Sequence, residues 1–394
     1  MRHFGQRIHD CRRNSKTFEQ IAQKRTKKFG NGNFDGSWTE RAFIGLMETS
    51  DPASNIWEDK GFVVCSASDK GKTDYGRSSI NDWEGYFKIN AIDPTYIITE
   101  NGEHWLVYGS WHSGIAALQV NPEDGKPLNA LGNPWNITGE DNSGYGKIIA
   151  TRGTSRWQAS EGPEVIYRDG YYYLFLAYGS LSVEYNTRVC RSRNIDGPYV
   201  DIHGNSAMGS AQLYPILTAP YRFDNSYGWV GISHCGIFDD GAGNWFYTSQ
   251  GRFPVNVGGN EYSNAIMMGH VRSIRWDANG WPLVMPERYG AVPQAPITEN
   301  EIAGDWEHLA LTNNTGTQRT SETMTYDLDT HKITSGSWKN ATWTFDAATQ
   351  TITTSAGVVL YLQREVDWEA SPRTHTIVYA AQGNQKTYWG KKLQ

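Results

Sequence analysis

Three short segments carry the residue types that acid–base chemistry and cation binding require. An Asn-Ala-Ile-Asp-Pro segment contains Asp93, a Ser-Glu-Gly-Pro segment contains Glu161, and a Ser-His-Cys segment contains His234. A glutamate held before a strand by Gly-Pro and crowded by aromatics is partly removed from water, which favours the protonated form that a general acid needs. Each residue alone also has a structural explanation, as a turn former or a core histidine. Their matched positions in the chain favour a common site.

A repeated pattern predicts the elements that position these segments. Gly102, Gly170 and Gly241 each stand in a turn that precedes an aromatic, β-prone strand, at intervals of roughly seventy residues. Each interval has room for about four strands, which is typical of the blades of a β-propeller, with a stacked sandwich as the alternative. Inner strands of successive blades begin at one end of a central channel. Residues about seventy apart therefore become neighbours.

Composition excludes several other classes of protein. The chain has 36 basic and 42 acidic side chains, which argues against nucleic-acid or anionic-membrane partners. The four cysteines lack metal-site spacing, and no apolar run is long enough to span a membrane. The basic N-terminal stretch has no apolar core, so no signal peptide is visible in it. Aromatic residues make up 13%, which suits a turn-rich β protein with faces on which sugar rings can stack.

Changes in composition divide the chain into three parts. Residues 1–40 form an atypical basic segment, residues 41–295 carry the repeated strands, and residues 296–394 alternate threonine and serine with apolar residues. The last part predicts a small antiparallel β-barrel. The barrel has three possible roles, namely packing support, extension of a substrate cleft, or a sugar-binding module.

Motifs in the central part resemble glycoside hydrolase family 43, in its arabinanase branch. They include the segments around Asp93, Glu161 and His234, the Tyr-Gly-Ser-Trp ending at Trp111, and the Val-Arg-Ser-Ile-Arg-Trp ending at Trp276. The resemblance covers about residues 41 to 290, and the last part resembles the small barrel of two-domain members. It implies an all-β fold, a five-bladed propeller whose first blade is atypical or incomplete, and inverting, endo-acting hydrolysis of α-1,5-linked L-arabinofuranose chains.

The resemblance also implies catalytic roles. Glu161 matches the general acid, and Asp93 matches the aspartate that orients and modulates it. The family's general base lies in a His-Asp-Pro segment, but this chain has His-Asp-Cys, ending at Cys11, so Asp10 is the proposed base and Asp35 the other candidate. An inverting mechanism needs two carboxyl groups far enough apart to admit a water.

Further expectations concern the metal, the substrate and the partners. His234 matches a histidine beside one metal ion, calcium or another hard cation. Trp111 is expected to stack on the sugar, and Asn90 and Ser110 to contact substrate. The expected partners are arabinan and arabino-oligosaccharides, without nucleic acid or membrane, for a secreted monomer or weak homo-oligomer. A β-xylosidase or α-L-arabinofuranosidase of the same family, or a catalytically degenerate arabinan-binding propeller, are the alternatives.

Overall fold

The fold is built from strands. The computed structural model describes residues 2–7, 42–66, 89–111, 114–132, 144–153, 160–210, 212–224 and 226–394. Within these residues the only α-helix is α2 (Glu299–Ile302), which Thr298 opens with a capping box. The all-β prediction is therefore confirmed. No helix in the described part of the chain is long and apolar enough to cross a membrane.

The first sheet has three antiparallel strands in the described residues. β1 (Arg2–Arg7) pairs with β2 (Phe43–Glu48), which pairs with β3 (Glu58–Cys65). The N-terminal segment thus contributes a strand to the sheet. Asp10 and Asp35, the candidate bases, lie outside the described residues.

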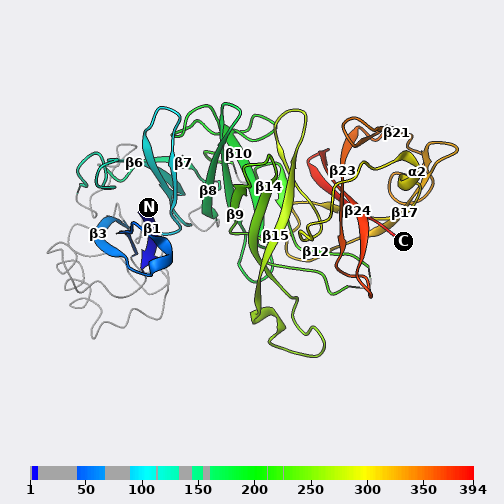
Figure 1. Ribbon diagram of the computed structural model, residues 1–394, viewed down its shortest axis with the longest axis horizontal. Helices are drawn as coiled ribbons and strands as arrows, with labels where there is room; N and C mark the ends of the chain where they lie inside the picture. The colour runs from blue at the N-terminus through cyan, green and yellow to red at the C-terminus, as the bar shows by residue number, and fades with distance from the viewer. Residues whose placement is uncertain are drawn as a thin grey trace. The chain divides into compact units, whose positions relative to one another are not determined.

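Three four-stranded sheets follow, and in each the strands are arranged in the order of the chain. Their orders are β4-β5-β6-β7, β8-β9-β10-β11 and β13-β14-β15-β16. In the last, β14 and β15 pair as a long antiparallel hairpin (Figure 1). Their bounds are β4 (Thr95–Ile98), β5 (His104–Tyr108), β6 (Ile115–Val120), β7 (Lys147–Ala150), β8 (Ser160–Arg168), β9 (Tyr171–Tyr178), β10 (Asn186–Ser192), β11 (Ile216–Thr218), β13 (Gly236–Asp239), β14 (Trp245–Arg252), β15 (Met267–Trp276) and β16 (Pro282–Val284).

The repeated glycines occupy equivalent turns in these sheets. Gly102, Gly170 and Gly241 lie between the first and second strands, with φ of 79°, 79° and 72°. Glycine adopts this left-handed conformation without steric cost, which explains why the turn recurs at these positions. The predicted unit of four strands with a glycine turn is confirmed. The five-bladed radial arrangement stays a prediction.

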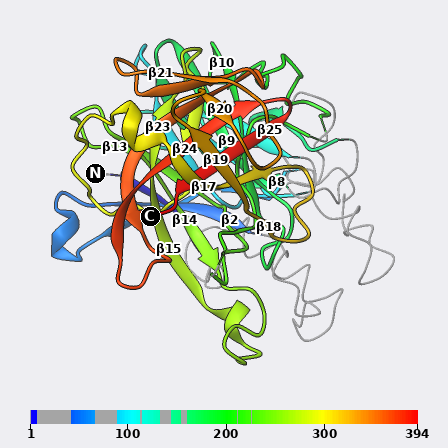
Figure 2. The same cartoon turned by 90° about the vertical axis from the view of Figure 1, so that its right-hand side faces the viewer.

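The C-terminal region forms a nearly closed antiparallel barrel of eight strands in the order β20-β19-β17-β25-β24-β23-β22-β21 (Figure 2). A bridge between Lys332 and Thr342 joins its two end strands. The barrel predicted from the sequence is confirmed. The strand bounds are β17 (Gly304–Leu311), β19 (Glu322–Asp327), β20 (Lys332–Ile333), β21 (Trp343–Asp346), β22 (Thr351–Thr354), β23 (Val358–Asp367), β24 (Thr374–Gly383) and β25 (Lys386–Lys392), while β18 (Arg319–Thr320) pairs with β12 (Tyr221–Arg222) outside it.

Contacts divide the chain into two compact units. The first comprises Met1–Phe175, Arg191–Val200 and Asn205–Gln212, and the second comprises Leu176–Cys190, Asp201–Gly204 and Leu213–Gln394. One apolar cluster of the first unit joins β2, β3, β5 and β6, and another fills the barrel in the second unit. The boundaries predicted at residues 40 and 295 stay predictions.

Candidate functional site

Glu161 is the centre of a group of interacting residues in the first unit. It is the second residue of β8 and its side chain is only 8% exposed. The hydroxyl of Ser110 donates to its Oε2 over 2.9 Å, and the indole Nε1 of Trp111 donates to the same oxygen over 2.8 Å. Two donors on one oxygen fix the orientation of the carboxyl group. A fixed orientation is one requirement of a general acid.

Asp93 is connected to the residue that follows the glutamate. Its Oδ2 accepts a hydrogen bond of 3.3 Å from the backbone N–H of Gly162. Two residues farther on, the hydroxyl of Thr95 donates to Oε2 of Glu164 over 3.0 Å. These bonds fasten the segment that begins β4 to the start of β8. The structure therefore brings Asp93 and Glu161 into one group.

Backbone bonds hold the Ser-Trp segment in the same place. The N–H of Trp111 donates to the carbonyl of Ser160, and that of Gly109 to the carbonyl of Ile92, each over 3.0 Å. Asn90 is 3% exposed and its Nδ2 donates to the carbonyl of Ser110 over 3.3 Å. Asn90 thus supports the segment from inside the protein. Its predicted contact with substrate, like that of Ser110, stays a prediction.

Several candidate residues have left-handed backbone conformations. The φ angles are 55° at Asp93, 54° at Trp111, 56° at Gly162 and 57° at His234. Such angles are uncommon for residues other than glycine and are costly for a bulky residue such as tryptophan. Strained backbone clusters at functional sites, where the surrounding structure holds it. Nine other non-glycine residues of the described chain share this conformation, so it is compatible with a functional role of these residues but does not by itself select them.

His234 belongs to the second unit and has an exposed side chain. Its Nδ1 lies 3.3 Å from the hydroxyl of Tyr185. Among the described residues His234 is not part of a group of three or more His, Cys, Asp or Glu side chains that could hold a metal ion. Calcium also takes backbone carbonyls and waters as ligands. The metal predicted beside His234 stays a proposal.

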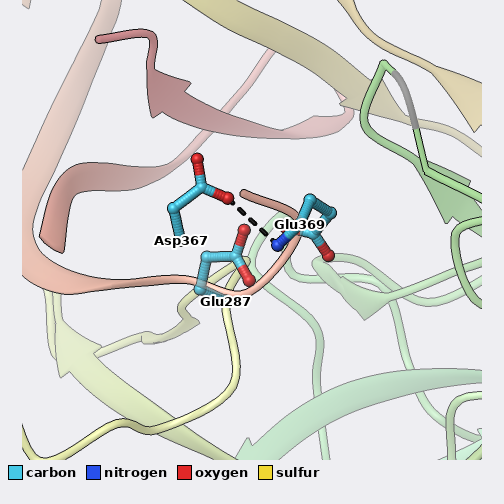
Figure 3. A group of neighbouring side chains, drawn as sticks. All are labelled: Glu287, Asp367 and Glu369. Carbon is cyan, nitrogen blue, oxygen red and sulfur yellow. Dashed lines mark hydrogen bonds between the residues drawn. The ribbon is translucent and has the colours of Figure 1, made fainter. Parts of the chain in front are cut away.

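The only such group in the described part of the chain consists of Glu287, Asp367 and Glu369 (Figure 3). The ammonium of Lys391 already lies among these carboxylates, 2.8 Å from Oε2 of Glu369 and 3.0 Å from Oδ1 of Asp367. Burial lowers the pKa of Lys391, but the carboxylates of Glu287 and Glu369 outweigh that effect and raise it above its usual value. The lysine therefore provides the positive charge that a metal would otherwise supply.

Sequence reasoning found the residues of the first unit but missed how they interact. It assigned Trp111 to stacking and Ser110 to substrate contact, which stay predictions, and the structure adds that both donate to Glu161. The available signal was their position at the end of β5, directly after a buried strand. Nothing in the sequence indicated the hydrogen bond between Thr95 and Glu164.

Comparisons with known proteins give the family of the chain. Residues 46–282 match the model of glycosyl hydrolases family 43, and residues 286–390 match the C-terminal lipocalin-like domain GH43_C. The extracellular endo-α-(1→5)-L-arabinanase 2 of Bacillus subtilis (strain 168) is 30% identical over 240 residues, which cover 55% of this chain and 46% of that protein. The extracellular endo-α-(1→5)-L-arabinanase of Thermotoga petrophila is 31% identical over 239 residues, which cover 56% and 46%.

A solved structure extends the likeness to most of the chain. The crystal structure of endo-1,5-α-L-arabinanase from Thermotoga petrophila RKU-1 has a TM-score of 0.71 and 25% identity, covering 90% of this chain and 78% of that chain. The chain spans about half the length of the curated relatives it matches. Because the family model alone covers residues 46–282 of 394, the protein belongs to glycosyl hydrolases family 43.

Proposed function

We propose that the protein hydrolyses α-1,5-L-arabinofuranosidic linkages in arabinan, with endo-action and inversion at the anomeric carbon. The observation that carries the proposal is the largely buried carboxyl group of Glu161, whose Oε2 accepts hydrogen bonds from Ser110 and Trp111. The substrate is taken from the arabinanases named above, since a fold does not decide a substrate.

The proposed reaction moves two protons. Glu161 donates its proton to the glycosidic oxygen as the bond from that oxygen to the anomeric carbon breaks. A water adds to the opposite face of the sugar and gives its proton to a second carboxylate, a geometry that needs carboxyl groups roughly 6.5–9.5 Å apart. Asp93 positions the acid through the N–H of Gly162. We assign the base to Asp10, with Asp35 as the second candidate.

The remaining parts of the proposal follow from the relatives and the family. Both Bacillus and Thermotoga relatives are named as extracellular, which supports secretion of this protein. A calcium ion beside His234 is retained as a proposal, but no step of the reaction depends on it. We propose a monomer or weak homo-oligomer that acts on the polysaccharide and its oligosaccharides.

The test is release of reducing sugar from linear α-1,5-arabinan by the parent and by Glu161→Gln. Glutamine keeps the shape of the side chain but has no proton to donate, so we expect a rate lower by about 10²–10⁴-fold. Glu164→Gln, three residues farther along β8, is the matched control. Its amide oxygen can still accept from Thr95, so we expect a rate within a few-fold of the parent.

Three results would contradict parts of the proposal. A Glu161→Gln rate near that of the parent would refute the acid. Faster release from xylo-oligosaccharides than from arabinan would favour the β-xylosidase alternative. Binding of arabino-oligosaccharide with no product at any protein concentration would favour the degenerate propeller. The lengths of the products test endo-action. The anomer that forms first, observed by NMR, tests inversion.

A further inference from the structure

A pocket of about 530 Å³ opens on the C-terminal barrel. It lies within the size range of small-molecule sites. Its walls come from β17, from the segment leading into β18 and β19, from the turn after β20, and from β25. The side chains that the argument uses are His308, Arg319, Glu322, Trp338, Lys386 and Tyr388.

Three rings form one side of the pocket. Trp338 is half-buried, while His308 and Tyr388 are 2% and 4% exposed. The Trp338 ring lies 4.6 Å from the His308 ring and 4.9 Å from the Tyr388 ring, and the His308 and Tyr388 rings stack at 5.5 Å. Because the three rings support one another, Trp338 is held as a fixed surface. Fixed aromatic surfaces suit the apolar face of a sugar ring.

Polar atoms on the same rings are available to a ligand. Nδ1 of His308 lies 2.6 Å from the hydroxyl of Tyr379. Its Nε2, the hydroxyl of Tyr388 and the indole N–H of Trp338 have no hydrogen-bond partner among the described residues. These atoms are not sealed in the interior but remain accessible from the pocket. A ligand with hydroxyl groups would satisfy these atoms.

The charges around the pocket favour a neutral ligand. Burial lowers the pKa of His308 to about 3, so its ring is uncharged at neutral pH and offers one donor and one acceptor. Arg319 donates to the hydroxyl of Thr312 over 2.6 Å, and Glu322 accepts from the N–H of Ser337 over 3.2 Å. The walls therefore mix positive charge from Arg319 and Lys386 with negative charge from Glu322, which suits a ligand that carries no charge of its own.

We propose that this pocket is a second saccharide-binding site, which holds sugar residues of a neutral oligosaccharide against Trp338. The identity of the sugar, an arabino-oligosaccharide, rests on the proposed function. The barrel then contributes to polymer binding in addition to its structural role. Short substrates that occupy only the catalytic site gain nothing from it.

The test follows Trp338 itself in the full-length chain. The protein carries Glu161→Gln, which slows turnover, and its 16 tryptophans are replaced by 5-fluorotryptophan. The fluorine signal that disappears in Trp338→Phe is assigned to Trp338. We expect linear arabinotetraose to move this signal saturably. In native gels that contain arabinan, we expect Trp338→Ala to weaken retention about tenfold, corresponding to the loss of one aromatic contact. Trp338→Phe, which keeps an aromatic face, should have a smaller effect.

Trp245→Ala is the matched control, because Trp245 is a half-buried tryptophan of β14 outside the pocket walls. It should leave retention unchanged. A Trp338 signal that does not move with arabinotetraose or xylotetraose at millimolar concentration would overturn the inference, even if arabinan is cleaved. A signal that moves with xylotetraose alone supports the saccharide site and contradicts an arabino-oligosaccharide as its ligand. If Trp338→Ala does not fold, the fluorine titration still tests the inference, because it does not use that variant.

Discussion

Replacing Lys391 by methionine tests whether one buried ammonium neutralises the carboxylates around it. The side chain of Lys391 is 2% exposed. Four carboxylate oxygens surround its Nζ, those of Glu369 at 2.8 Å, Asp367 at 3.0 Å, Glu287 at 3.3 Å and Glu307 at 3.5 Å. Methionine fills most of the same volume without the charge. The variant therefore removes the cation and leaves the negative charges in place.

The expected cost is large and depends on pH. Removing one partner of a buried ionic group lowers the free energy of unfolding by about 3–5 kcal/mol. In the parent, the ammonium contributes fully to the free energy of unfolding below the pKa of an unfolded lysine, 10.5. This contribution is lost as pH rises through the raised pKa of Lys391 in the folded protein. Burial already raises the pKa of Glu287, and loss of Lys391 raises it further. Protonation of Glu287 then relieves the defect, which should be largest at pH 7–8 and shrink toward pH 5.

Urea unfolding at pH 5, 7 and 8 measures this difference, with Lys392→Met as the control. The Lys392 ammonium donates to the backbone carbonyls of Glu301 and Ala303, and no carboxylate of the described residues forms an ion pair with it. We expect the control to lose about 1–2 kcal/mol, with little change between pH 5 and 8. Equal losses for the two variants, or a Lys391→Met defect that is the same at every pH, would refute the reasoning.

Three further predictions test the site, the barrel and the metal. Trp111→Phe keeps an aromatic ring but removes the donor to Glu161, so kcat should fall about 10–100-fold, from a loss of about 1.5–3 kcal/mol, with KM within about twofold. A raised KM with unchanged kcat would instead support sugar stacking. Trp389→Ala should lower the free energy of unfolding by about 3–5 kcal/mol, because Trp389 is fully buried and donates to the carbonyl of Val284. A decrease of less than about 1 kcal/mol in urea unfolding would contradict this. Calcium retained after dialysis, measured by atomic emission, should fall in His234→Gln, and equal calcium contents would remove His234 from the metal site.

Sequence reasoning succeeded where local patterns decide the structure. A glycine turn before an aromatic strand fixes a hairpin by itself, so Gly102, Gly170 and Gly241 could be placed correctly between paired strands. Alternation of polar and apolar residues likewise predicted the C-terminal barrel. In both cases the determining residues are neighbours in the chain.

Contacts between distant residues could not be predicted in the same way. Ser110 and Glu161 are 51 positions apart, and Lys391 gathers carboxylates from three separate segments. Which side chains meet depends on the register of the sheets and on the loops between them. The pocket around Trp338 depends in addition on a turn between β20 and β21. These features became visible only in three dimensions.

The backbone at Trp111 shows why geometry changes the interpretation of a residue. A tryptophan with φ of 54° is strained, yet its N–H is bonded to Ser160, its carbonyl accepts from Gly114, and its indole donates to Glu161. The two backbone bonds hold the segment in this conformation, and the indole bond orients the carboxyl group. Loss of the indole N–H would remove one of the donors to Glu161. We therefore infer that Trp111 acts through Glu161, as a positioning residue, and that its strain is part of how the acid is held.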